Sequence, residues 1–159
     1  RAPPQPMSDS ELRDLRRGAD YQFGRGAGAA LIDDAVEVTH TSSGRPRQVH
    51  ADDGRTATYA TDGRFVLGLA GGRRLLDAFD APAHRVVVGS ESEPFVREGR
   101  NTFAKFVQEA DPSIRPGDET LVVHENGDLL AVGRAELPGS GIDDFETGMA
   151  VKVRQGTDS

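Results

Sequence analysis

The stretch Gly99-Arg-Asn-Thr-Phe-Ala-Lys-Phe-Val107 decides the fold of the second half of the chain. Its alternating residues predict a strand over 102–107, with Phe103, Lys105 and Val107 on one face. The rigid segment Asp111-Pro-Ser-Ile-Arg-Pro-Gly-Asp118 follows it. Further strand patterns complete the set, at residues 120–123, 129–135 and 148–154. A short strand, a rigid connection, a hairpin and a closing strand together predict a small β-rich module.

The charge of the chain is acidic, but its basic residues are unusual. There are 19 basic and 26 acidic residues, which give a formal net charge of −7. This balance argues against general attraction to nucleic acid, because phosphate contacts need cations. Only Lys105 and Lys152 are lysines, however, and a composition rich in arginine, aspartate and small residues is typical of salt-adapted proteins. We therefore predict a halophilic protein whose local basic patches carry the binding information; a GC-rich genome is the alternative explanation.

Composition also excludes several classes of protein. Cysteine is absent, which excludes disulfides and thiolate metal sites and fits a cytoplasmic location. No apolar run reaches the roughly 18 residues of a spanning helix, so we expect no membrane contact. Residues 1–6 are basic and proline-rich without a following apolar run, so we expect no signal peptide. We expect residues 1–7 to be a disordered tail or an expression remnant.

Residues 8–83 mix helical and strand patterns and predict a small α+β domain. Ser8-Asp-Ser-Glu11 has the form of a capping box at a helix start. The apolar residues that follow recur at helical spacing: Leu12, Leu15, Ala19 and Phe23. Asp53-Gly54 and Asp62-Gly63 predict hairpin turns. A helix predicted over 70–79 ends at a proline, so we expect two separate cores joined near Asp80–His84.

Residues 84–156 predict the second domain. An apolar strand is expected at 85–88, and a single helical turn over Glu93–Glu98 is stopped by Gly99. Asn126-Gly127 is the strongest hairpin signal in the chain. These elements predict a compact unit built around strands.

Segments of the second unit form the pattern of a known domain: Phe95–Asn101, Phe103–Val107, Ile114–Asp118, Leu130–Gly133 and Ala150–Arg154. They resemble the PUA domain, an RNA-binding fold attached to many RNA-modifying enzymes. Shorter segments of the first unit extend the pattern: Ala19–Gly24, Val36–Val38 and Ser43–Arg45. These are similar to the module before the PUA domain in archaeal tRNA-guanine transglycosylases, which begin archaeosine synthesis. The resemblance, closest to the C-terminal region of these enzymes, implies an α+β fold: a pre-PUA α+β domain, then a PUA mixed-strand pseudo-barrel.

The resemblance also implies RNA contact through the first PUA helix, the strand after it and the closing strand. Carried onto this sequence, it gives the candidate RNA-binding residues Arg97, Gly99, Arg100, Asn101, Phe103, Lys105, Lys152 and Arg154. Gly99 lets backbone approach a phosphate closely, and Arg97 and Arg100 can fork onto phosphate oxygens. Phe103 can stack an unpaired base only if it points outward. The alternative is that Phe103 and Phe106 both belong to the core.

Other motifs carry little chemistry. Gly24-Arg-Gly26-Ala-Gly28-Ala29 is close to a dinucleotide fingerprint, but it follows a helix rather than a strand. The histidines are scattered, and the acid pairs lie beside turn signals. We therefore expect no catalytic residue, no metal and no cofactor. Arg73-Arg74 and Gly44-Arg-Pro-Arg47 are weaker candidates for phosphate contacts, with solvated surface as the alternative.

The sequence leaves three functions open. The first is a non-catalytic protein that binds tRNA or another structured RNA. The second is an accessory subunit that gives RNA binding to a separate catalytic transglycosylase chain. The third is an interaction module of the ribosome or translation machinery. We expect no catalysis, because the similar enzymes use a barrel of about 250 residues and a cysteine-rich zinc site.

Overall fold

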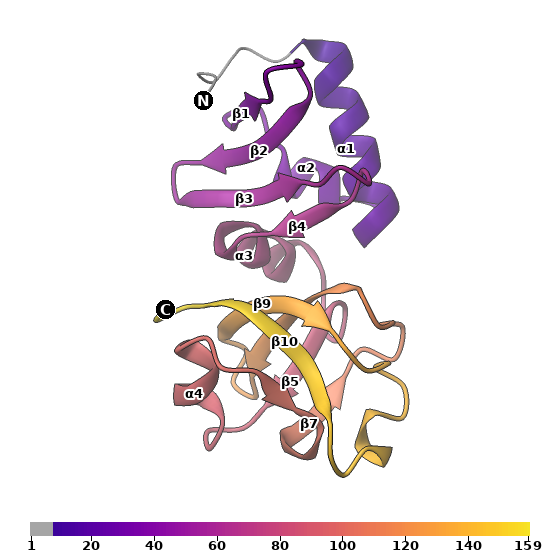
Figure 1. The fold of residues 1–159 in the computed structure, drawn as a ribbon, viewed down its shortest axis with the longest axis vertical. Helices are drawn as coiled ribbons and strands as arrows, with labels where there is room; N and C mark the ends of the chain where they lie inside the picture. Colours follow the sequence, from indigo (N-terminus) through magenta and orange to yellow (C-terminus); the bar gives the residue numbers. More distant parts are fainter. Residues whose placement is uncertain (1–7) are drawn as a thin grey trace. The chain divides into compact units, whose positions relative to one another are not determined.

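The computed structural model describes residues 8–159, which form two compact units (Figure 1). The first unit ends at Ala78, and the second begins at Phe79. Each unit has its own sheet. The expectation of a disordered tail at residues 1–7 lies outside the described residues. The predicted boundary between residues 83 and 84 stays a prediction.

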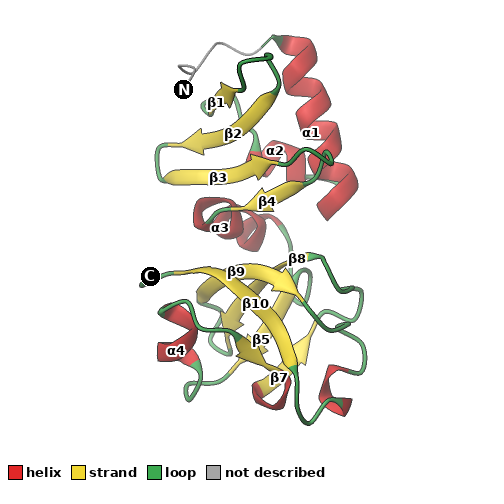
Figure 2. Ribbon diagram, viewed as in Figure 1, coloured by secondary structure: helices red, strands yellow, loops and turns green. Residues whose placement is uncertain are grey.

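The first unit combines three helices with an antiparallel sheet (Figure 2). Its helices are α1 (Asp9–Phe23), α2 (Ala27–Leu31) and α3 (Leu69–Ala78). Its strands are β1 (Glu37–His40), β2 (Pro46–Ala51), β3 (Gly54–Tyr59) and β4 (Phe65–Leu67), and they pair in the order of the sequence. The predicted hairpin turns lie between β2 and β3 and between β3 and β4.

Helix α1 begins and packs as its sequence predicts, with one difference. The N–H of Glu11 donates to the hydroxyl of Ser8 at 3.1 Å, which caps the helix. The carboxylate of Glu11 does not complete a capping box but lies 2.6 Å from Nε2 of buried His40. Leu15, Ala19 and Phe23 are buried, so one face of α1 supplies the core of this unit.

The second unit is a nearly closed barrel of mixed strands. Its strands are β5 (Arg85–Val88), β6 (Thr102–Phe103), β7 (Val107–Ala110), β8 (Glu119–His124), β9 (Leu129–Ala135) and β10 (Met149–Gly156). Its helical elements are α4 (Glu93–Arg97) and the 3-10 turns η1 (Ala104–Phe106) and η2 (Ile142–Asp144). The sheet order is β6-β10-β9-β8-β5-β7, with β5 and β8 parallel and the other pairs antiparallel. Valine, alanine, isoleucine and leucine side chains fill its interior.

One predicted strand is wrong. Residues 102–107 do not form a continuous strand, because η1 separates β6 from β7. The N–H of Ala104 donates to the carbonyl of Gly148 at 2.9 Å, and the Ala104 side chain is buried where the turn begins. The turn carries the chain from β6 at one end of the sheet order to β7 at the other.

Candidate nucleic-acid interface

Helix α4 ends in a glycine turn that directs the chain into β6. Gly99 has φ 103°, a conformation that only glycine adopts without strain. Its N–H donates to the carbonyl of Val96 at 2.9 Å, and the N–H of Arg100 donates to that of Phe95 at 3.0 Å. These are the bonds of a glycine-terminated helix. The turn therefore fixes how α4 faces β6.

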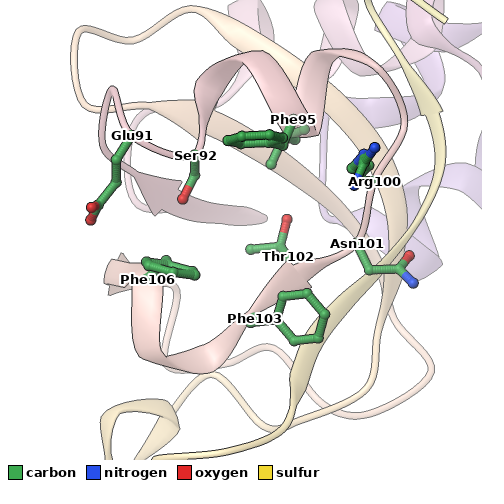
Figure 3. Close-up of a pocket in the computed structure, with 9 residues that line it drawn as sticks. Glu91, Ser92, Phe95, Arg100, Asn101, Thr102, Phe103 and Phe106 are labelled. Carbon is green, nitrogen blue, oxygen red and sulfur yellow. The ribbon is translucent and has the colours of Figure 1, made fainter.

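A pocket of about 320 Å³ lies between α4, β6 and η1 (Figure 3). Its lining includes the rings of Phe95, Phe103 and Phe106. Phe95 is 52% exposed and Phe103 is 45% exposed, which is unusual for residues of this size. Phe103 thus points outward, which decides between the two orientations that the sequence leaves open. Phe106 is half-buried and lies outside the central core cluster.

The hydroxyl of Thr102 is one of the polar groups of this largely apolar pocket. Thr102 is 2% exposed, and within the described residues its Oγ1 has no hydrogen-bond partner. Figure 3 shows this oxygen on the side of Phe95 and the methyl group of Thr102 on the side of Phe106. A buried hydroxyl without a partner costs about 1–3 kcal/mol. A ligand that supplies a donor or acceptor at this point recovers that free energy.

Two of the predicted cations lie beside the rings of the pocket. The guanidinium of Arg100 is 5.8 Å from the centre of the Phe95 ring, and its side chain is 71% exposed. Its contact with the Glu98 carboxylate is long, at 3.9 Å. The ammonium of Lys105 is exposed and lies 5.1 Å from the centre of the Phe106 ring. Exposed cations beside exposed rings suit a ligand that is both anionic and aromatic.

The third predicted cation, Lys152, extends from the strand next to β6. Val151 pairs with Thr102 and is buried, so the exposed Lys152 points to the opposite, outer face of the sheet. Arg134 on β9 lies directly across from Lys152 and is also exposed. Its Nε lies 3.2 Å from the carboxylate of Glu136.

Arg97 and Asn101 instead bind other parts of the barrel. The guanidinium of Arg97 donates to the Glu93 carboxylate at 2.8 Å and to the Thr157 hydroxyl at 3.0 Å. The Asn101 side-chain oxygen accepts from the N–H of Val153 at 2.9 Å. Both side chains connect the α4–β6 segment to β10 and the residues after it. An RNA contact by either one stays a prediction.

Arg154 is also held within the protein. Its guanidinium makes a two-pronged contact with the carboxylate of Glu119, whose side chain is only 7% exposed. Because a buried carboxylate needs a cationic partner, Arg154 stabilises the folded domain by pairing with Glu119. Its predicted RNA contact also stays a prediction.

Two family models match nearly the whole chain. Residues 13–82 match the model described as the patch-forming domain C2 of tRNA-guanine transglycosylase, and residues 84–157 match the PUA domain. The chain is a C2 domain followed by a PUA domain. The sequence-based resemblance and the α+β fold with a mixed-strand barrel are thereby confirmed.

The C2–PUA chain is similar to part of several archaeal enzymes. It is 47% identical over 154 residues to tRNA-guanine(15) transglycosylase of Pyrococcus furiosus, covering 96% of this chain and 26% of that protein. The corresponding protein of Methanothermobacter thermautotrophicus is 44% identical over 148 residues, with 92% and 23% covered. The match is to their C-terminal region. The chain therefore spans about a quarter of the length of these relatives.

Solved structures share the fold of both domains. A hypothetical protein of Pyrococcus horikoshii aligns with a TM-score of 0.70 at 22% identity, covering 99% of this chain and 96% of that one. A conserved PUA domain protein of Thermoplasma acidophilum aligns with a TM-score of 0.65 at 21% identity, covering 96% and 93%. At these identities the likeness shows the fold alone.

Sequence reasoning missed several groups of the PUA pocket. Phe95 and Thr102 lie within the segment that the sequence singles out, but no role for their side chains follows from the pattern. Ser92, which is buried at the start of α4, also lines the pocket. Arg134 was missed because only the strand register places it opposite Lys152.

The weaker candidates of the C2 domain also include arginines that contact other parts of the protein and an arginine that is exposed. Arg74 donates to the Asp33 carboxylate at 2.8 Å and to Asp53 at 3.4 Å. The hydrogen bond and charge of Arg74 lower the pKa of Asp33. Arg45 lies over the Tyr59 ring, 4.8 Å from its centre. Arg73 remains exposed at the surface.

The geometry beside the pocket does not suit nucleophilic catalysis. The hydroxyl of Ser90 lies 2.9 Å from Nε2 of His124, as in a serine–histidine pair. However, Nδ1 of His124 accepts a hydrogen bond from the N–H of Asn126, so the neutral ring carries its proton on Nε2 and cannot take one from Ser90.

Residues 8–159 contain no cluster of three or more potential metal ligands. Over the same range no helix is long and apolar enough to cross a membrane.

Proposed function

We propose that this chain is an RNA-binding module whose PUA pocket holds an unpaired nucleobase. The observation that carries the proposal is the buried, unpartnered hydroxyl of Thr102 in a pocket lined by phenylalanine rings. A nucleobase has apolar faces that stack on such rings and edges that donate and accept hydrogen bonds. It therefore satisfies both the walls of the pocket and the hydroxyl within it.

The exposed cations around the pocket complete the interface. Arg100 and Lys105 lie at the rings, and Lys152 lies on the outer face of β10. Phosphates on either side of the inserted base bind these cations, with the planar guanidinium of Arg100 as a fork. In an acidic chain such a local group of cations gives the RNA its point of attachment.

The RNA of this proposal is tRNA, and the role is accessory to a transglycosylase. Support comes from the relatives, which are named tRNA-guanine(15) transglycosylases and match this chain over nearly its whole length. The C2–PUA part binds the tRNA, and the base exchange takes place elsewhere. We further propose an archaeal, salt-adapted cytoplasm as its setting, supported by the archaeal relatives and by the acidic, lysine-poor composition.

The pocket is tested by measuring the affinity of the full chain for a tRNA transcript and for a blunt RNA duplex. Thr102→Val keeps the shape of the side chain and removes the hydroxyl, and Phe103→Ala removes one ring. We expect each to weaken tRNA binding by about tenfold, the equivalent of one lost hydrogen bond or one lost stacking contact. Neither change should alter binding to the blunt duplex, which offers no free base.

A matched control and a stability measurement sharpen this test. Phe145 is 38% exposed in the same domain but does not line the pocket, so Phe145→Ala should leave tRNA affinity unchanged. Thr102→Val should raise the free energy of unfolding by about 1 kcal/mol, because it removes an unpartnered buried hydroxyl. Variants at Thr102 and Phe103 that bind tRNA as tightly as the unvaried chain contradict the proposal.

The accessory role has its own test. The chain alone, given tRNA and labelled base, should bind the tRNA and incorporate no label. Added to a transglycosylase chain that lacks its C2 and PUA domains, it should increase incorporation. Label incorporated by the pure chain alone contradicts the accessory role.

A further inference from the structure

The exposed face of α1 carries a row of side chains with no structural task. Arg13, Arg17 and Tyr21 are spaced four residues apart and are all exposed. Positions four apart lie on one helix face and rise about 6 Å along the axis. Arg25 follows at the same spacing in the turn after the helix and is also exposed. We call these four residues the α1 row.

The guanidinium groups of this row are in no ion pair within the described residues. Within residues 8–159 no hydrogen bond or ion pair holds Arg13, Arg17 or Arg25. Their neighbour Arg16 shows the contrast, because it donates to Asp34 and to the carbonyl of Ile32. In a chain with 26 acidic residues, partners for exposed arginines are abundant. A row left without partners therefore has cationic charge to offer a ligand.

Tyr21 adds an aromatic surface to this charge. It is 94% exposed, the highest value among the exposed large hydrophobic residues of the described chain. The opposite face of α1 buries Leu15, Ala19 and Phe23, so the core does not use the Tyr21 ring. A free ring among guanidinium groups is the combination that binds single-stranded nucleic acid by stacking and phosphate contact.

We propose that the α1 row is a second RNA-binding surface, on the C2 domain. Its arginines bind phosphates, and Tyr21 stacks an unpaired base. The proposal rests on the proposed function for the choice of RNA as the ligand. RNA is favoured because two sites on one chain bind one molecule of RNA more tightly than either does alone. The α1 row contacts RNA without using any residue of the PUA pocket.

The α1 row is tested in the full chain with a tRNA transcript as the probe. The double variant Arg13→Gln with Arg17→Gln removes two charges and keeps good helix formers. We expect about tenfold weaker binding and a salt slope reduced by about 1.4–1.8, which corresponds to two phosphate contacts. The matched control, Arg64→Gln with Arg115→Gln, removes two exposed charges that belong to none of the candidate RNA contacts and should change affinity less than twofold.

Tyrosine fluorescence gives a direct reading of Tyr21. The chain has two tyrosines and no tryptophan, so Tyr59→Phe leaves Tyr21 as its one fluorophore of this kind. Phenylalanine keeps the ring that Tyr59 packs 5.0 Å from Phe65. Stacking of a base should quench the emission of this variant when tRNA is added. Unchanged emission at saturating tRNA contradicts the stacking part of the proposal.

The outcomes separate the two RNA surfaces. If the α1 variant binds like the unvaried chain while Phe103→Ala is weakened, the α1 row is wrong and the pocket stands. If the α1 variant is weakened while Thr102→Val and Phe103→Ala are not, the row stands and the pocket is wrong. Equal losses of tRNA affinity in the α1 variant and its matched control would show that only the total charge matters, and they contradict the α1 row as a binding surface. An unvaried chain that binds no RNA contradicts both.

Discussion

The side-chain oxygen of Asn101 accepts a hydrogen bond of 2.9 Å from the backbone N–H of Val153. Backbone pairing of β6 with β10 ends at Thr102 and Val151, and β10 is irregular just after Val153. Asn101 thus continues the β6–β10 pairing by one side-chain bond. Because Thr102 and Phe103 follow directly, this bond fixes the strand that carries two groups of the pocket.

Asn101→Ala should therefore destabilise the PUA domain by about 1–2 kcal/mol, since a part-buried N–H loses its acceptor. Asn101→Asp keeps an acceptor oxygen and should restore most of the stability. Denaturant unfolding measures both variants. If Asn101→Ala leaves the free energy of unfolding unchanged but weakens RNA binding, Asn101 contacts RNA directly, as the sequence predicts.

Arg154 should behave as a structural residue first. Removing it leaves the carboxylate of Glu119 buried without its cation, and we expect Arg154→Ala to cost about 2 kcal/mol. The double variant Arg154→Ala with Glu119→Gln should be less destabilised, because the unpaired charge is gone. Thermal unfolding of the two variants checks this order. A double variant less stable than the single one contradicts this account of the ion pair.

Acid should weaken the PUA domain through Asp111. Burial opposes its ionisation, but hydrogen bonds from Ser113 and from the N–H of His84 outweigh burial, so its pKa lies below the ordinary value of 3.8. A depressed folded pKa gives stability that is complete above the unfolded pKa and is lost as the pH falls through the folded one. Unfolding measured from pH 6 to pH 2 should show this loss, and Asp111→Asn should flatten it below pH 3.8.

Much of this fold could be predicted because its signals are local. Asn126-Gly127 forms the predicted turn between β8 and β9, with Gly127 at φ 99°. The helical spacing of the apolar residues in α1 correctly predicts that Leu15 and Ala19 are buried. The strand predicted over 102–107 failed because its alternation does not reveal η1. That turn depends on Ala104 meeting Gly148, far along the chain.

The candidate site could be predicted only in part, for the same reason. Resemblance pointed to Arg100, Phe103 and Lys105, which do surround or flank the pocket. It could not separate them from Arg97, whose partner Thr157 lies 60 residues away. Side chains that bind distant parts of the fold look like free cations in a sequence.

Salt dependence tests the proposed halophilic setting. At about 1 M salt the screening length is about 3 Å, so long-range attraction contributes little to binding. Stacking in the PUA pocket and close arginine contacts are less affected. We expect measurable tRNA binding near 1 M potassium chloride. Complete loss of specific binding by about 0.3 M argues against a salt-adapted protein.

Gly156 at the end of β10 should control the shape of the pocket from behind. A Cβ at this position would lie 2.3 Å from the carbonyl oxygen of Arg97 and 2.6 Å from that of Val96. Both oxygens belong to the backbone of α4, which cannot yield as a flexible side chain does. Gly156→Ala must therefore push α4, and Phe95 with it, away from β10. We expect a cost of about 1–3 kcal/mol from overpacking, together with weaker tRNA binding under conditions in which all of the variant is folded.

Gly18→Ala is the matched control, because a Cβ at this position of α1 would make only an ordinary 3.6 Å contact with Phe65. That change should stabilise the helix by about 0.5–1 kcal/mol and leave tRNA binding unchanged. If Gly156→Ala folds with full stability and binds tRNA normally, the close approach of α4 to β10 does not set the pocket.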